Sequence, residues 1–135
     1  MAYCTQTDIE LIHGQRNVIT WSNLDNNVEA AVTSVIDNAI ARADAFIDDE
    51  LRSGPYAIPL VDKLTGITPL TIKFISAELA GYFLFLNRGL RDSDVGERMM
   101  QHKKEAESYL NMCRSGQRQL NAVRSDNTPT APSIA

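Results

Sequence analysis

The side chains that could carry acid–base or metal chemistry are few, and they form no known catalytic pattern. His13 and His102 share no HExxH or histidine–cysteine spacing, so the sequence predicts no metal site. Cys4 and Cys113 lack the CxxC spacing of redox and zinc sites, and we predict two free thiols. None of the seven glycines belongs to a phosphate-binding GxGxxG loop. We therefore expect no catalytic residue, no cofactor and no metal.

Acidic side chains gather in one stretch, at Asp44, Asp48, Asp49 and Glu50. On a helix these residues do not converge on a cation as the ligands of a calcium loop do, because that site needs a turning loop. Asp37 precedes Asp44 by seven residues and Asp48 follows it by four, which places all three opposite the apolar stripe of the predicted helix. We interpret the acidic run as a solvated face, or as a charged surface that faces a neighbouring subunit or a lumen, and metal binding is the least favoured alternative.

Glu78 is a carboxylate in the most apolar stretch of the chain. A buried carboxylate needs a partner, so we predict an ion pair with an arginine such as Arg42 or Arg88 rather than a catalytic acid. His102 falls on an apolar helix face, where we expect a core or interface histidine with its hydrogen bonds satisfied. His13, in the last turn of a predicted helix, is favourably placed against the helix dipole.

The elements that position these residues are predicted to be helices. Thr7 and Glu10 fit the capping box that starts a helix, and Gly14 marks the end of that helix. Residues 15–20 could add another turn.

Three longer helices follow, and each has a recognisable start. Asn27 can cap the first of them, and residues 92–94 can cap the last. Thr68 before Pro69 marks the start between these two, with proline at the first helical position. No segment has a convincing strand pattern, so we predict an all-α fold of about four helices. The three longer helices are predicted at residues 28–52, 69–88 and 93–114.

The helix at 69–88 is apolar on all sides, which predicts burial on all sides. In a small domain, that burial could come partly from the chain itself and partly from a neighbouring subunit. Lys73 and Glu78 would be costly in lipid, so we predict a buried helix rather than a membrane span. Gly81 costs about 1 kcal/mol relative to alanine inside a helix, which indicates a close approach of another helix there.

Composition divides the chain into a helical domain at 1–116 and an extended C-terminal arm at 117–135. The arm is rich in polar residues and proline, and alone it cannot bury enough apolar surface to order itself. We therefore expect a partner to hold it, and we expect its deletion to leave the fold intact.

The chain has 135 residues and a net charge of −4, with 13 basic and 17 acidic residues. One domain fits this length, and the acidic balance disfavours a dedicated nucleic-acid binder. The charge is uneven: residues 1–62 carry ten acids and three bases, net −7, whereas residues 63–135 carry seven acids and ten bases, net +3.

Four segments, in this order and spacing, resemble those of a phage protein family: residues 1–9 (MAYCTQTDI), 40–48 (IARADAFID), 54–60 (GPYAIPL) and 80–84 (AGYFL). The family is that of the Mu-type head–tail joining proteins, and the likeness covers roughly residues 1–116. Pro55 stands where the family commonly has arginine, and the tail after Gly116 has no match that we can identify.

The resemblance implies a non-enzymatic connector of the virion neck, assembled in the cytoplasm of the bacterial host. Such proteins form a ring, typically of twelve copies, between the portal protein and a stopper or tail-terminator protein. DNA passes through the ring without sequence-specific binding, and no membrane is involved. We expect the arm to dock on the portal, the apolar helix to meet the neighbouring subunit, and an acidic stripe to face the channel. The expected portal contacts are Arg118, Leu120, Val123, Arg124 and Ile134, the subunit contacts are Phe74, Tyr82 and Phe85, and the stripe is Asp37, Asp44 and Asp48.

Two other classes of protein remain open from the sequence. A small helical DNA-binding oligomer, such as a terminase small subunit, would need a basic recognition helix, whereas the first helix carries Asp8 and Glu10. A helical enzyme would need clustered acids with perturbed pKa values, which a sequence does not show.

Overall fold

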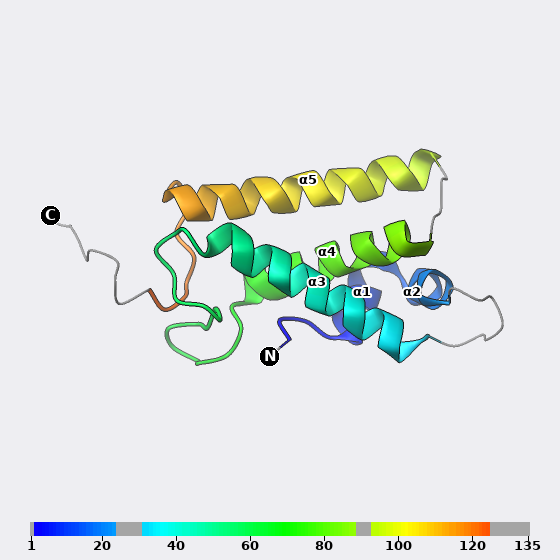
Figure 1. Cartoon of the computed structure of the whole chain (residues 1–135), viewed down its shortest axis with the longest axis horizontal. Coiled ribbons are helices and arrows are strands. Elements are labelled where there is room, and N and C mark those ends of the chain that lie inside the picture. Colours follow the sequence, from blue (N-terminus) through cyan, green and yellow to red (C-terminus); the bar gives the residue numbers. More distant parts are fainter. Residues whose placement is uncertain (1, 24–30, 89–92, 125–135) are drawn as a thin grey trace, which may run out of the picture.

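The computed structural model describes residues 2–23, 31–88 and 93–124, and that part of the chain folds into five α-helices (Figure 1). It contains no strand beyond an isolated antiparallel bridge between Tyr56 and Arg124. The predicted all-α class is confirmed, with one helix more than expected. The helices are α1 (Gln6–His13), α2 (Gln15–Ser22), α3 (Thr33–Leu51), α4 (Leu70–Arg88) and α5 (Ser93–Ser115).

The first helix begins earlier than the sequence predicts. Its cap is Thr5, whose side chain accepts a hydrogen bond from the backbone N–H of Asp8, while the Asp8 carboxylate accepts from the backbone N–H of Thr5. The capping box is therefore Thr5 with Asp8, and the prediction of Thr7 with Glu10 is wrong by two residues. Gly14 ends the helix as predicted, at φ 93°, and the expected extra turn is the whole of α2.

Helix α3 is described from Thr33, and its start carries no side-chain cap. The predicted cap Asn27 lies outside the described residues. The helix ends at Leu51, where the N–H of Gly54 bonds to the Leu51 carbonyl. Its apolar stripe is buried against α4, as the helical spacing predicts. The stripe consists of Ile36, Ala39, Ile40, Ala43, Ile47 and Leu51.

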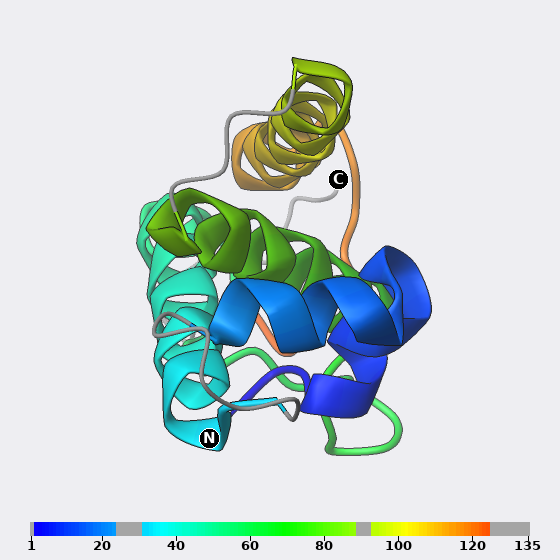
Figure 2. The same ribbon diagram turned by 90° about the vertical axis from the view of Figure 1, so that its right-hand side faces the viewer.

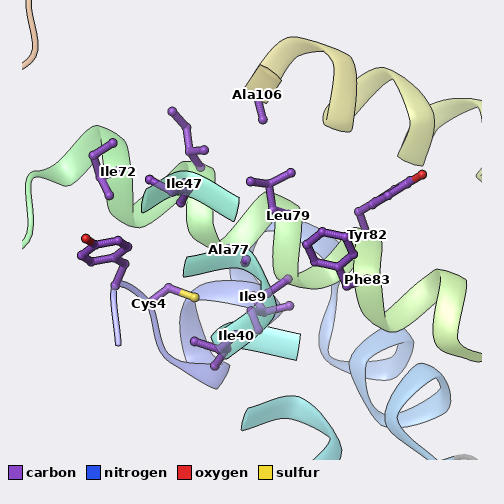
Figure 3. Close-up of a cluster of buried hydrophobic side chains, with 14 of the residues drawn as sticks. Cys4, Ile9, Ile40, Ile47, Ile72, Ala77, Leu79, Tyr82, Phe83 and Ala106 are labelled. Carbon is purple, nitrogen blue, oxygen red and sulfur yellow. The ribbon is translucent and has the colours of Figure 1, made fainter. Parts of the chain in front are cut away.

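Helix α4 is the centre of the bundle and contacts all four other helices (Figure 2). It alone among the described helices is long and apolar enough for its length and composition to suit a membrane span, and more than half of it is buried inside the protein. Figure 3 shows side chains from α1, α3, α4 and α5 meeting around it, including Ile9, Ile47, Leu79 and Ala106. The predicted buried helix is therefore covered largely by the chain's own elements.

Helix α5 lies across α3 and α4 along the top of Figure 1. The apolar face that carries His102 forms a stripe that is largely buried, and Gly116, at φ 85°, follows the last residue of the helix. The fully or nearly buried members of the stripe are Met99, Ala106, Leu110 and Cys113. Both Cys113 and Cys4 are free thiols, as predicted.

The chain after α5 turns back onto the loop between α3 and α4. The N–H of Ala57 bonds to the Val123 carbonyl, and the N–H of Val123 bonds to the Val61 carbonyl. The N–H of Leu120 donates to the Tyr56 hydroxyl at 2.7 Å. The first eight residues of the predicted arm therefore lie on the chain's own body, and residues 125–135, Ile134 among them, lie outside the described residues.

Candidate interaction surfaces

The N-terminal residues are fixed to α3 and α4 by a buried polar cluster. The Asp44 carboxylate accepts from the backbone N–H of Tyr3 at 3.0 Å and from the Ser76 hydroxyl at 2.7 Å. The Tyr3 hydroxyl donates to Asp48 and accepts from the N–H of Leu60. One tyrosine thus joins the N-terminus, α3 and the loop before α4.

Burial sets the electrostatics of this cluster. It raises the pKa of the Asp44 carboxyl, although the hydrogen bonds from Ser76 and Tyr3 oppose that shift. Burial also raises the pKa of the Tyr3 phenol, helped by its hydrogen bond to Asp48. The Cys4 thiol has its pKa raised to about 11 by burial, so it stays protonated and unreactive at neutral pH.

The predicted acidic stripe is not one solvated face. Asp44 is buried, because the N-terminal segment crosses α3 there. One carboxylate oxygen accepts from the backbone N–H of Tyr3 in that segment, and the other accepts from the Ser76 hydroxyl of α4. The prediction that Asp44 lies on the solvated side of the helix is therefore wrong. Asp37 is exposed and Asp48 is half-buried. Helical spacing alone could not reveal this burial, since the covering segment is 41 residues away in the chain.

A groove of about 660 Å³ runs between the N-terminal segment and α3. Ile40, Ala41 and Ala45 give it an apolar lining, and Asp37 and Asp48 contribute acidic groups. Its remaining lining residues are Ala2, Cys4, Thr5, Gln6 and Asp44. The small alanine side chains on α3 leave this space open.

The loop before α4 and the first residue of α4, Leu70, carry exposed apolar side chains. Leu64 is 90% exposed, and Ile67 and Leu70 are both more than 60% exposed. Phe74, one turn further along α4, is 44% exposed. An exposed group of large apolar residues is typical of an interaction surface.

The three aromatic residues predicted at a subunit interface differ in burial in the structure. Tyr82 and Phe85 are buried in the chain's own core, where Phe85 packs edge-on against Trp21 at 5.4 Å between ring centroids. Phe74 alone of the three stays exposed. The extra helix α2 covers Phe85 through Trp21, and α5 covers Tyr82, whose hydroxyl donates to the Met100 sulfur at 3.8 Å.

The two histidines are in contact, although no spacing in the sequence indicates that they pair. Their rings pack edge-on at 5.5 Å, with His13 on α1 and His102 on α5. His102 Nδ1 lies 3.0 Å from the Glu78 carboxylate, so the partner of Glu78 is this histidine and not the predicted Arg42 or Arg88. His13 is buried, and burial together with the His102 charge lowers its pKa to about 4. This places a neutral imidazole inside the bundle at pH 7.

The residues predicted to contact the portal differ in exposure in the structure. Leu120 is buried against the chain's own loop. Arg118 and Arg124 are exposed, with their guanidinium groups over the rings of Tyr109 (5.1 Å) and Tyr56 (6.0 Å). Val123 is 40% exposed. The described residues contain no group of three or more histidine, cysteine or acidic side chains placed to hold a metal ion.

The fold and these surfaces define a small helical domain with a complete core, an acid-lined groove and an exposed apolar loop. Its sequence matches the family model described as Bacteriophage Mu, Gp36 over residues 3–135. The chain therefore belongs to the bacteriophage Mu Gp36 family and is a phage protein of the structural, virion-associated kind. The match extends through the C-terminal tail, for which the motifs gave no counterpart. A comparison with curated proteins finds no match.

Proposed function

We propose that this protein is a non-catalytic adaptor of the phage neck, which forms a ring under the portal protein. The ring, of about twelve copies as the resemblance implies, would extend the DNA channel and present a surface to the stopper or tail-terminator protein. DNA would pass through without sequence-specific contacts.

The observation that carries this proposal is the exposed apolar group around Leu64, Ile67, Leu70 and Phe74 on a domain whose core is otherwise complete. Such surface is costly in an isolated monomer and is covered in an assembly. Membership of a phage structural family supplies the context in which a small helical domain would be repeated around a channel.

Electron microscopy of the purified protein, with and without portal rings of the same phage, tests the proposal. We expect closed rings with a central channel, stacked coaxially on the portal where the portal is present. A protein that stays monomeric under both conditions, at concentrations well above those of an assembling virion, would contradict the ring.

A further inference from the structure

We propose that the loop of residues 62–67 of one copy inserts into the groove between the N-terminal segment and α3 of a second copy. This inference rests on the proposed ring, and it names the contact from which the ring is built. A loop and a groove are different surfaces, so the contact is heterologous and can be repeated from copy to copy until a ring closes.

The loop is a rigid projection. The Asp62 carboxylate accepts from the N–H groups of Leu64 and Thr65, at 2.8 and 3.1 Å. The N–H of Asp62 bonds to the Ile67 carbonyl, and the N–H of Gly66 bonds to the Asp62 carbonyl. The Asn121 side chain, from the segment after α5, donates to the other Asp62 carboxylate oxygen at 2.7 Å. Together these bonds hold the loop in shape, with Leu64 exposed. A preformed loop loses little conformational entropy on binding, which favours its use as an insert.

The groove complements this loop in size and in chemistry. At about 660 Å³ it is within the range of about 300–1,000 Å³ that encloses a drug-sized ligand. Its apolar lining of Ile40, Ala41 and Ala45 suits the side chain of Leu64. Asp37 and Asp48 supply acidic groups for Lys63, the exposed cation beside Leu64. Opposite charges at the rim of an apolar contact favour the correct partner.

The two surfaces are held at a fixed angle within one copy. In Figure 1 the loop lies at the left end of the molecule, and the N-terminal segment lies beside α3 near its middle. The Tyr3 hydroxyl connects them, because it bonds to Asp48 at the groove and to the N–H of Leu60 at the base of the loop. A fixed angle between the two surfaces gives every junction the same rotation, as closure of a ring requires.

Two variants, each with one of the two surfaces disrupted, test the contact. Leu64→Asp puts a charge on the loop, and Ala41→Phe fills the groove; both positions are exposed, so the fold should be retained. Sedimentation velocity should show each variant as a monomer at concentrations at which the wild type assembles. The protein concentration at which half of the chains are assembled should rise by about 30-fold or more, as for loss of a hot-spot side chain. An equimolar mixture should form a dimer and stop there, because one intact loop meets one intact groove.

Exchanging the charges of Lys63 and Asp37 tests the proposed ion pair at the edge of the groove. Lys63→Asp and Asp37→Lys should each raise the concentration for half assembly by about tenfold, which is about 1.4 kcal/mol of contact energy, and the double variant should recover most of that loss. Leu11→Asp and Asp49→Lys are matched controls, because each changes an exposed residue of the same type outside both surfaces. Both controls should assemble like the wild type.

The experimental outcomes distinguish a failure of the loop–groove contact from a failure of the proposed ring. If the wild type assembles and Leu64→Asp or Ala41→Phe assembles equally well, the loop–groove contact is wrong and the ring stands. If the wild type fails to assemble with and without portal rings, the proposed ring fails and the contact fails with it.

Discussion

At the residue scale, His13 and Gly81 meet where α1 crosses α4. The His13 ring lies directly on the glycine, so that a Cβ added at Gly81 would be 2.1 Å from Nε2 of His13. The sequence predicts a close approach here because glycine is costly inside a helix. The sequence does not reveal that a histidine ring, rather than a helix backbone, makes the approach.

Gly81→Ala should destabilise the protein. The added methyl group clashes with a buried ring at 2.1 Å, so the overpacking cost lies in the upper part of the usual range of about 1–3 kcal/mol and exceeds the gain of about 1 kcal/mol in helix propensity. Urea unfolding measures the change. Gly96→Ala is the matched control, because a Cβ there meets only Phe85 Cζ at 4.0 Å, so this change should be neutral or stabilising. Equal effects of the two substitutions would contradict the close contact at Gly81.

The buried His13 should also make stability depend on pH. Its pKa in the folded protein is about 4, whereas in the unfolded chain it is near the ordinary value of 6.5. Between these values the unfolded state binds a proton that the folded state does not, so the free energy of unfolding falls as the pH drops from about 6.5 to about 4. The full loss is about 3 kcal/mol.

The comparison with His13→Gln isolates this contribution, because glutamine does not titrate. Unfolding in urea at several pH values between about 4 and 7 should give a steeper decline for the wild type than for the variant. The raised pKa of Asp44 acts in both proteins and cancels in the difference. Parallel curves would rule out His13 as the source of the pH dependence.

At the element scale, the start of α1 shows what sequence patterns can and cannot decide. Thr5 and Thr7 are both threonines with an acidic residue three positions on, Asp8 and Glu10, so both fit a capping pattern. The structure uses Thr5, and Glu10 instead accepts a hydrogen bond from the side chain of Gln6. Tertiary contacts make the choice, since Asp8 also pairs with Lys73 of α4 at 3.4 Å.

Thr5→Ala should therefore cost about 1 kcal/mol of stability, the usual loss for an N-cap. Thr7→Ala, within the first turn and exposed, should change stability by only a few tenths of a kcal/mol. Urea unfolding of the two single variants side by side distinguishes them. A larger loss at Thr7 would show that the helix starts where the sequence pattern first suggested.

The segment after α5 was predicted as an arm separate from the fold, and its composition explains why. Polar residues and proline dominate it, and its apolar residues are isolated in the sequence. The burial of Leu120 and Ala122 depends on the loop at 53–68, which lies more than fifty residues away. Helical boundaries and the core stripes are local patterns and could be predicted; the groove, the histidine pair and this contact depend on long-range packing.

Two truncations separate the contribution of residues 117–124 from that of residues 125–135. Deleting residues 117–135 should destabilise the domain by about 2–3 kcal/mol, since it removes buried Leu120 and its hydrogen bond to Tyr56. Deleting only residues 125–135 keeps Leu120 and this hydrogen bond, so that loss should be absent. If the portal-docking role of the arm is correct, the shorter deletion should also abolish co-sedimentation with portal rings. Full binding by that variant would contradict the docking role.

At the scale of the whole molecule, the acidic half and the basic half of the sequence place opposite charges on different surfaces. The acidic first half contains α3 and the groove with Asp37 and Asp48, whereas the second half supplies Lys63 on the loop and the exposed Arg118 and Arg124 after α5. Unlike surfaces of this kind suit a repeating head-to-tail contact. A protein specialised for binding DNA would instead gather its cations on one face.

The assembled protein should therefore leave double-stranded DNA unbound. With a net charge of −4 per copy, the proposed ring would have no excess of cations to displace the counterions of DNA, even at about 50 mM salt, where such binding is strongest. An electrophoretic mobility assay over a range of salt concentrations checks this, with Asp49→Lys, which should assemble like the wild type, as a more basic comparison. Retardation of DNA by the wild type that weakens steeply with salt would favour a DNA-binding oligomer, such as a terminase small subunit, over an adaptor through which DNA slides.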